Sequence, residues 1–395
     1  MGDVCLKPGW KDEALALLMD LLAIRSVNGE DDETEMAEYI RRYLEDHGVG
    51  ATVRPLGGKK ASVVAALGAD GPTMVWNGHL DTVAYGDLDR WETDPAVPIQ
   101  KGGRIYGRGS ADMKSGLAAF VYALCAMSGA GAPLKHKIIF IGSGDEESGA
   151  AGAMDAVEAG LMEDARFVLI GEPTGMAIGL AQKGGIWLEM EVKGKTGHGA
   201  YPKEGINAIE DAFRLAVGIK TYVESFSHEL LGPATAQITM VEGGIMPNMT
   251  PDVCKIMMDI RLVPAITKEM VLTRLNDLAN VQEEPGTLRR IDYSYSRHLD
   301  RLSLGHSVEK DKDNPFVREL ADSFRACGLE PQYVGLSYIT DGSVLINHDP
   351  TMTIALFGPG EAQMAHKPNE SVRADDYLKA IEILVGAATV GEGAV

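Results

Sequence analysis

Residues 138–147 read IIFIGSGDEE, an apolar run that ends in a turn with two adjacent carboxylates, Glu146 and Glu147. The apolar part predicts a buried strand. Carboxylates at the end of such a strand are costly to desolvate unless positive charge lies beside them. In a loop just past the strand, one carboxylate can bind a metal while the other holds a proton. By themselves, the two residues are equally consistent with a solvated acidic turn.

Four other segments place metal-type side chains just past apolar or glycine-rich stretches. They are His79 after the run 72–78, Asp112 in the loop 106–116, Glu172 after the run 167–170, and His366 after the segment 352–360. Ligands of open α/β sheets gather beyond the carboxyl ends of the strands. The sequence therefore offers two histidines and at least four carboxylates to one crevice.

The alternation of periodic segments predicts the fold class. Apolar residues recur at helical spacing in segments 11–23, 33–47, 115–127 and 150–159, and strand-like runs lie between these segments. This βα alternation predicts an α/β domain whose mostly parallel sheet is covered by helices on both faces.

The pattern changes from about Lys183. Segments 185–192 and 255–262 alternate as half-exposed antiparallel strands, and helices are predicted at 207–225 and 268–282. Strands and helices in this order suit a small α+β insert. A charged stretch follows before α/β character returns.

Length and pattern together predict two domains, because 395 residues exceed the usual size of a single core. We expect a catalytic domain formed by residues 1–182 and 298–395. A small α+β domain at 183–297 is expected to interrupt it.

Composition narrows the class of protein. A net charge of −20 argues against a nucleic-acid partner, whose phosphates would be repelled. Neither a signal peptide nor an apolar segment of membrane-spanning length is apparent, so we expect no membrane partner. The four cysteines are scattered without a C-x-x-C spacing, which favours reduced thiols in a cytoplasmic protein.

The residue types indicate the chemistry. Imidazole and carboxylate together favour zinc or a similar ion over calcium and magnesium. Five residues with one shared carboxylate fit two metal ions: His79, Asp112, Glu147, Glu172 and His366. Glu146 is left over, and an uncoordinated carboxylate beside the metals is suited to be the general base. Asp81 is suited to bond the free imidazole nitrogen of His79.

The motifs resemble those of the dinuclear zinc amidohydrolases that include acetylornithine deacetylase, succinyl-diaminopimelate desuccinylase, aminoacylase-1 and glutamate carboxypeptidase. The matching segments are GHLDTV at 78–83, GRGSADMK at 107–114, DEESG at 145–149, GEPT at 171–174 and AHKPNE at 365–370. They occur in the family's order and span most of the chain. The resemblance implies a zinc-peptidase-like catalytic domain.

The resemblance also implies a division of the ligands between two zinc ions per chain, with Co²⁺ or Mn²⁺ as substitutes. His79 and Glu172 would hold one ion, and Glu147 and His366 the other. Asp112 would bridge the two ions, a position that often precedes a cis peptide bond.

The insert resembles the family's lid and dimerisation domain. In the segment GHGAYP at 197–202, the resemblance implies that His198 reaches the partner subunit's active site and donates a hydrogen bond to the oxyanion. Asn248 and Arg261 resemble positions that hold the substrate's carboxylate, a role that suits the fork of an arginine. A histidine or a strand arginine that is merely exposed at the surface would fit the same residues.

Together these features predict a homodimeric enzyme that hydrolyses an amide bond beside a carboxylate in an N-acyl amino acid or a small peptide. The metal and acid–base residues do not select between a deacetylase or desuccinylase and a dipeptidase or carboxypeptidase. A mononuclear metallohydrolase and a non-catalytic binding protein of the same fold are also compatible with these residues. Retention of Glu146 argues against the binding protein.

Overall fold

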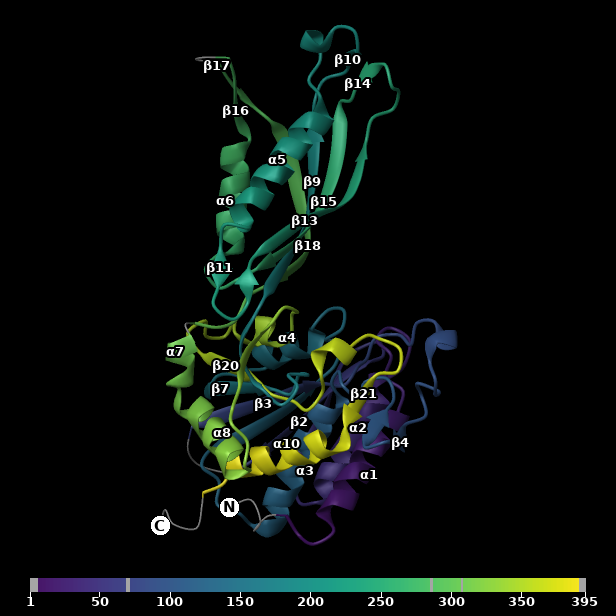
Figure 1. The fold of residues 1–395 in the computed structure, drawn as a ribbon, viewed down its shortest axis with the longest axis vertical. Helices are drawn as coiled ribbons and strands as arrows, with labels where there is room; N and C mark the ends of the chain where they lie inside the picture. Colours follow the sequence, from purple (N-terminus) through teal and green to yellow (C-terminus); the bar gives the residue numbers. More distant parts are fainter. Residues whose placement is uncertain (1–5, 69–71, 285–286, 307, 391–395) are drawn as a thin grey trace. The chain divides into compact units, whose positions relative to one another are not determined.

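The computed structural model describes residues 6–68, 72–284, 287–306 and 308–390. They separate into two compact units, each with its own sheet and helices (Figure 1). Unit 1 combines the chain up to Leu180 with Gly305–Val334 and the residues from Thr340 onward, and unit 2 comprises Ala181–Leu304 with Gly335–Ile339. The main segment of unit 2, Ala181–Leu304, is therefore inserted between two segments of unit 1.

An eight-stranded sheet forms the centre of unit 1, in the order β1-β2-β6-β3-β7-β20-β8-β19. Its strands are β1 (Ala51–Gly57), β2 (Lys60–Leu67), β3 (Thr73–His79), β6 (Lys137–Ser143), β7 (Ala165–Ile170), β8 (Ile178–Gln182), β19 (Tyr333–Leu336) and β20 (Thr353–Leu356). The central neighbours β6, β3, β7 and β20 are parallel. The pairs β1–β2, β2–β6 and β20–β8 are antiparallel. The expected α/β fold with a mostly parallel sheet is confirmed.

Helices cover this sheet. The longer ones are α1 (Trp10–Ala23), α2 (Glu33–Asp46), α3 (Lys114–Ala130), α8 (Pro315–Ala326) and α10 (Ala374–Ala388). Helix α3 packs on α1 and α10, and α10 packs on α8, below the sheet in Figure 1. Helix α4 (Ala151–Glu158) lies above the sheet and packs on β6 and on the short α9 (Gly342–Leu345).

Three short strands form a separate sheet in unit 1, in the order β21-β5-β4. They are β4 (Ile99–Lys101), β5 (Arg104–Tyr106) and β21 (Ser371–Arg373). This sheet joins the loop that leads to Asp112 with the segment that follows His366. A single-turn helix, α7 (Val308–Lys312), precedes α8.

Unit 2 contains a four-stranded antiparallel sheet in the order β13-β15-β9-β18. Its elements are β9 (Gly184–Lys193), α5 (Ala208–Val223), β13 (Thr235–Gly243), β15 (Val253–Leu262), α6 (Lys268–Leu278) and β18 (Asp292–Arg301). Alternate residues of β9, such as Leu188 and Met190, are buried in a core that α5 and α6 complete. Trp187 lies on the opposite face and is 42% exposed.

Two details of unit 2 differ from expectation. Helix α6 ends at Leu278 instead of continuing to Gln282, because Asn280–Glu284 form strand β16, which pairs with β17 (Thr287–Arg290). The unit extends to Leu304 instead of ending near residue 297, because β18 remains paired with β9 through Arg301.

In the described part of the chain, none of the helices combines the length and the apolar character needed to cross a membrane.

Candidate metal centre

The parallel register of β3, β6 and β7 brings three loops to one edge of the sheet. His79 is the last residue of β3, and it pairs with Ser143, the last residue of β6. β7 ends at Ile170, and the N–H of Gly171 donates to the carbonyl of Asn77 on β3 (2.9 Å). The turns that carry Glu146–Glu147 and Glu172 therefore begin beside His79.

Asp112 reaches the same edge because α3 starts against the end of β7. A Cβ added at Gly116 would lie 1.8 Å from the carbonyl oxygen of Gly171, so a side chain at this position would prevent the approach. The peptide bond between Asp112 and Met113 is cis, as the family resemblance implies.

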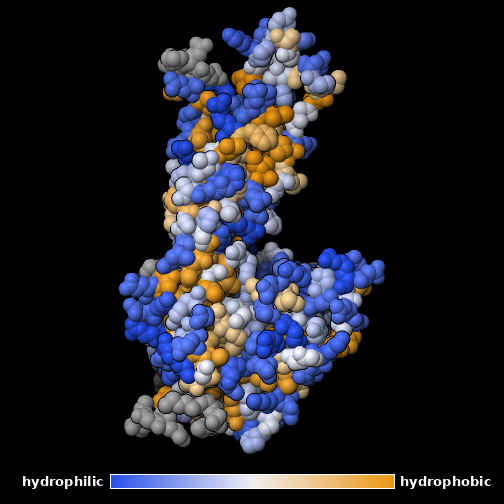
Figure 2. Space-filling model, viewed as in Figure 1, coloured by the Kyte–Doolittle hydropathy of each residue, from blue (hydrophilic) through white to orange (hydrophobic). Residues whose placement is uncertain are grey.

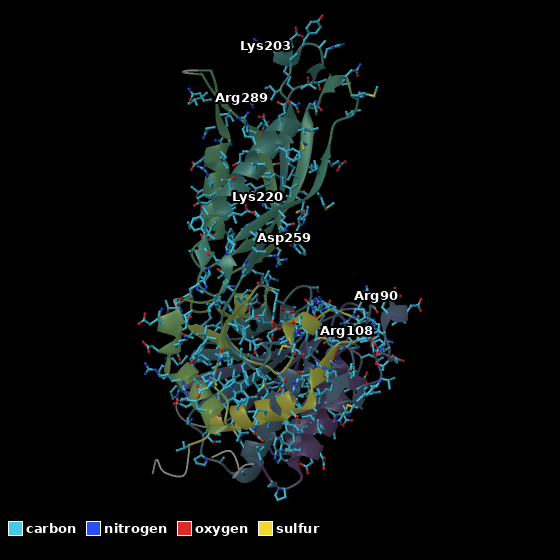
Figure 3. All side chains as sticks on the ribbon, viewed as in Figure 1. Arg90, Arg108, Lys203, Lys220, Asp259 and Arg289 are labelled. Carbon is cyan, nitrogen blue, oxygen red and sulfur yellow. The ribbon has the colours of Figure 1, made fainter. Side chains whose placement is uncertain are left out.

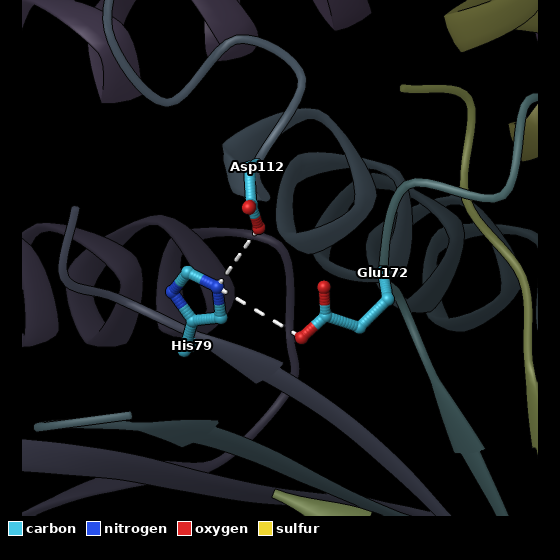
Figure 4. A group of neighbouring side chains, drawn as sticks. All are labelled: His79, Asp112 and Glu172. Carbon is cyan, nitrogen blue, oxygen red and sulfur yellow. Dashed lines mark hydrogen bonds and ion pairs between the residues drawn. The ribbon is translucent and has the colours of Figure 1, made fainter. Parts of the chain in front are cut away.

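Three side chains converge at the first group of potential ligands (Figure 4). The Nε2 atom of His79 lies 3.3 Å from Asp112 Oδ1 and 4.0 Å from Glu172 Oε1. All three residues are at least nine-tenths buried. A single divalent ion could be coordinated by one atom from each of these side chains.

The second group lies on the other side of Asp112. The Nε2 atom of His366 is 3.3 Å from Asp112 Oδ2 and 3.2 Å from Glu147 Oε1. His366 has a left-handed backbone (φ 59°), and its side chain is 53% exposed. The two oxygens of Asp112 thus face one imidazole each, which is the arrangement expected of a carboxylate that bridges two ions.

The charges of the centre fit cations. In the metal-free protein, burial and the charge of Asp112 raise the pKa of Glu172 well above its ordinary value. Burial likewise raises the pKa of Glu146. Burial opposes ionisation of Asp112 as well, but hydrogen bonds from His366 and His79 outweigh it and lower its pKa. Carboxyl groups that repel one another in this way are stabilised when divalent cations join them. Imidazole and carboxylate together suit zinc.

Glu146 lies in the same turn as Glu147 but belongs to neither group of potential ligands. It is half-buried, and its N–H donates to Asp81 Oδ1 (3.1 Å). Its carboxylate is therefore not part of either candidate ligand group.

Asp81 was expected to contact the imidazole of His79, and it also contacts the turn that carries Glu146 and Glu147. His79 Nδ1 donates to the main-chain carbonyl of Asp81 (2.9 Å), while the Asp81 carboxylate lies further away, 3.7 Å from Nδ1. That carboxylate accepts the N–H groups of Glu146 and Glu147, at 3.1 and 3.0 Å. Asp81 thus orients His79 through its backbone and the acidic turn through its side chain.

Sequence reasoning did not single out Glu370 as a side chain that supports the centre. Its Oε1 accepts the N–H groups of Ala111 (2.9 Å) and Asp112 (3.0 Å), and its Oε2 is 2.6 Å from Arg108 Nη1. The pair is buried, and the Arg108 guanidinium, labelled in Figure 3, also lies over the ring of Trp91. Arg108 and Glu370 both occur in the quoted motifs, which was the available signal, but their pairing depends on the fold.

The candidate residues of unit 2 lie in two separate regions of that unit. Strand β10 (Gly197–His198) pairs with β14 (Met249–Thr250), and the N–H of Gly199 donates to the carbonyl of Asn248 (2.8 Å). His198 and Asn248 therefore lie side by side, and both are exposed. The Ala200 N–H donates to His198 Nδ1 (3.0 Å), so the neutral imidazole carries its proton on Nε2.

Arg261 lies apart from these residues, on β15. Its Nε and Nη2 donate to the two carboxylate oxygens of Asp259, at 2.7 and 3.0 Å (Figure 3 labels Asp259). Lys183 is buried, and desolvation, followed by the charge of Arg261, lowers its pKa.

Comparison with known proteins places the chain among metallohydrolases. The sequence profile described as Peptidase family M20/M25/M40 matches residues 75–389. A probable succinyl-diaminopimelate desuccinylase of Staphylococcus epidermidis is 27% identical over 407 residues, covering 94% of this chain and 96% of that protein.

Two solved structures of similar fold are an aminopeptidase PepT and a dinuclear metal-binding peptidase. PepT of Bacillus cereus matches with a TM-score of 0.73 at 20% identity, covering 95% of this chain and 97% of that one. The Bacillus subtilis YXEP protein, described as a dinuclear metal-binding peptidase from the M20 family, matches with a TM-score of 0.68 at 17% identity. The match covers 98% of the YXEP chain and 96% of this chain. At these identities the likeness concerns the fold.

Proposed function

Because the chain belongs to the peptidase family M20/M25/M40, and is thus a hydrolase of that family, we propose that it hydrolyses an amide bond with two zinc ions. The substrate we propose is an N-acyl amino acid or a small peptide. One observation carries the proposal: the two oxygens of Asp112 face different imidazoles, and Glu146, next to the candidate ligand Glu147, belongs to neither candidate ligand group.

In this proposal His79 and Glu172 would hold one ion, Glu147 and His366 would hold the other, and Asp112 would be a ligand of both. Zinc, when bound, supplies Lewis-acid polarisation of the scissile carbonyl and makes water more acidic.

The chain's own residues handle the protons. The Glu146 carboxylate accepts a proton from the attacking water and passes it to the nitrogen of the leaving amine. Asp81 holds the N–H groups of Glu146 and Glu147, which keeps the base and the ligand in one fixed turn.

We assign to His198 the stabilisation of the oxyanion, acting in the active site of a partner subunit. Its proton on Nε2 makes it a donor, and its exposure leaves the ring free to reach another chain. Arg261 and Asn248 are proposed to bind the substrate's carboxylate. The Asp259 carboxylate fixes the plane of the Arg261 guanidinium through Nε and Nη2, and this pair does not use Nη1.

A homodimer is proposed because unit 2 exposes apolar residues on an edge strand and the adjacent helix. On β13, Met240 is 68% exposed and Val241 48%, and on α5, Val217 is 51% exposed. Figure 2 shows apolar side chains gathered beside α5 on the visible face of unit 2. A two-fold interface is the commonest way to bury such a surface.

We also propose a cytoplasmic location, which the reduced thiols of Cys125 and Cys254 support.

A hydrolysis screen with zinc present tests the function. It compares N-acetyl amino acids, N-succinyl amino acids and dipeptides, at matched concentrations. We expect an N-acyl substrate to be hydrolysed faster than dipeptides, in keeping with the name of the relative that is 27% identical. Faster dipeptide hydrolysis would favour a peptidase. No turnover by protein that holds two zinc ions would reject the enzyme proposal in favour of a binding protein.

Adding zinc back to chelated protein tests the number of ions. Full activity at one equivalent per chain would favour a mononuclear enzyme.

A further inference from the structure

The segment between α1 and α2 runs alongside the loop that follows β3. The N–H of Thr82 donates to the carbonyl of Ser26, and the N–H of Asn28 donates to the carbonyl of Thr82, both at 2.9 Å. The Ser26 hydroxyl donates to the carbonyl of Leu80 (2.7 Å). The backbone of Asn28 is thereby held beside Asp81, although 53 residues separate the two in sequence.

The side chain of Asn28 joins two carboxylates. Its Nδ2 donates to Asp81 Oδ2 (2.7 Å) and to Asp145 Oδ1 (3.1 Å). A primary amide has two N–H groups, and both are used here. Asp81 and Asp145 are almost fully buried, so a neutral donor between them relieves a repulsion that water cannot screen.

Each of these carboxylates supports the acidic turn. Asp81 accepts the N–H groups of Glu146 and Glu147. Asp145 directly precedes them with a left-handed backbone (φ 67°), and it is held by Ser148 Oγ (2.7 Å) and Lys60 Nζ (2.6 Å). The amide of Asn28 therefore lies between the loop of His79 and the turn of Glu146 and Glu147.

We propose that Asn28 is a positioning residue of the metal centre, which sets the spacing between the His79 loop and the Glu146–Glu147 turn. It does so by donating to Asp81 and Asp145 at once. Its catalytic consequence rests on the proposed function, whereas its effect on the turn does not.

Hydrogen–deuterium exchange in metal-free protein tests the inference without any substrate. Asn28→Ala removes both donors and should speed exchange of the Glu146 and Glu147 amides by about tenfold or more. Asn28→Asp has the same shape but places a third carboxylate between two others, so its exchange should be faster still. If Asn28 only fills space, the order reverses, because the isosteric aspartate would then be the milder change.

Asn314 provides a matched control in unit 1. It caps α8 by accepting the N–H of Phe316 (2.9 Å), a role in which aspartate serves as well as asparagine. Asn314→Ala should lower the melting temperature and Asn314→Asp should not, and neither should change exchange in the turn. Equal exchange in the wild type and both Asn28 variants would overturn the proposal.

A charge exchange covers the case in which Asn28→Asp does not fold. The double variant Asn28→Asp/Asp145→Asn restores an amide–carboxylate pair between positions 28 and 145, and it should recover part of the lost protection. The bridging role is contradicted if the folded double variant recovers no protection and if, in addition, the Glu146 and Glu147 amides of Asn28→Ala exchange at the wild-type rate.

Zinc affinity, measured by competition with a chelator, connects the inference to the centre. Asn28→Ala should weaken binding by about 10–100-fold, the usual effect of removing a group that supports metal ligands. The value of kcat should fall while KM changes little. Wild-type protein that binds zinc but hydrolyses nothing would reject the proposed function alone. Unchanged zinc affinity in Asn28→Ala would reject the role of Asn28 alone.

Discussion

The candidate residues of unit 1 and those of unit 2 differ in how they are held. His79 and Glu172 are 1% and 3% exposed, and each lies within reach of another candidate ligand. In unit 2, His198 and Asn248 are exposed and touch their own strand pair through backbone contacts. His79 and Glu172 thus have candidate partner ligands within their own chain, whereas we propose that His198 and Asn248 meet the substrate or another subunit. We therefore expect substitutions in unit 1 to affect metal binding or the chemical step, and substitutions in unit 2 to affect catalysis or substrate binding without loss of metal.

The largest effect is expected in the shared ligand of unit 1. Asp112→Ala removes a ligand from both ions and should lose more than one zinc equivalent per chain, together with all activity. His79→Ala and His366→Ala should each weaken mainly one ion. Metal analysis of the purified variants measures this, and two zinc ions retained by Asp112→Ala would contradict the bridging role.

Glu146→Gln should separate chemistry from metal binding within unit 1. We expect turnover to fall by ~10²–10⁴-fold, the usual cost of losing a general base, with both ions retained. Steady-state kinetics and zinc content on the same sample provide the measurement. Near wild-type rates in the fully loaded variant would disprove the assignment.

His198→Ala carries the comparison into unit 2. Loss of one oxyanion donor should lower kcat by ~10²–10³-fold with little change in metal content. Mixing it with Glu146→Gln chains should restore part of the activity, because a mixed dimer contains one site with both residues intact. Failure to complement despite proven subunit exchange would place His198 in its own chain's site or in none.

Arg261→Lys should have a smaller effect, confined to substrate binding. Lysine keeps the charge but loses the planar fork, so KM should rise by about 10–100-fold, as expected for about 1.5–3 kcal/mol from hydrogen bonds to a charged group. Asp259→Asn, which loosens the same guanidinium, should act in the same direction but less. A fall in kcat at constant KM would contradict a role in binding.

The smallest effect concerns His366 in the metal-free protein. Hydrogen bonds to Asp112 and Glu147 raise the pKa of His366 to about 10. Its contribution to stability is therefore fully present below 6.5, the ordinary pKa, and is lost as the pH rises through about 10. Because the side chain is 53% exposed, we expect only a modest fall in melting temperature over this range. His366→Gln should remove this part of the pH dependence.

The sequence predicted those features of the fold that depend on local hydrophobic patterns. Apolar runs that end in histidine or carboxylate indicated β3, β6 and β7, and parallel pairing then brings their ends together. The mostly parallel sheet followed from the same alternation. The assigned roles of the ligands, of Glu146, and of His198, Asn248 and Arg261 stay predictions.

What the sequence did not reveal depends on contacts between distant segments. Glu370 meets the Asp112 backbone across 258 residues, and Asn28 meets Asp145 across 117. The side chain of Asp81 serves the acidic turn more closely than the imidazole, because β3 and β6 are in register. The end of α6 was missed because pairing with β17 outweighs helical spacing at residues 280–282.

The place of β20 in the sheet has a consequence during synthesis. β20 lies between β7 and β8, yet it is translated after the whole of unit 2 up to Ile339. His366 emerges roughly 190 residues after Glu172, which takes about 10–40 s at ~5–20 residues per second. During that interval the nascent chain holds four of its five potential ligands, and β7 and β8 lack the strand between them. Unpaired strand edges invite wrong partners, so we expect the growing polypeptide to be most prone to aggregation in the interval before β20 is made.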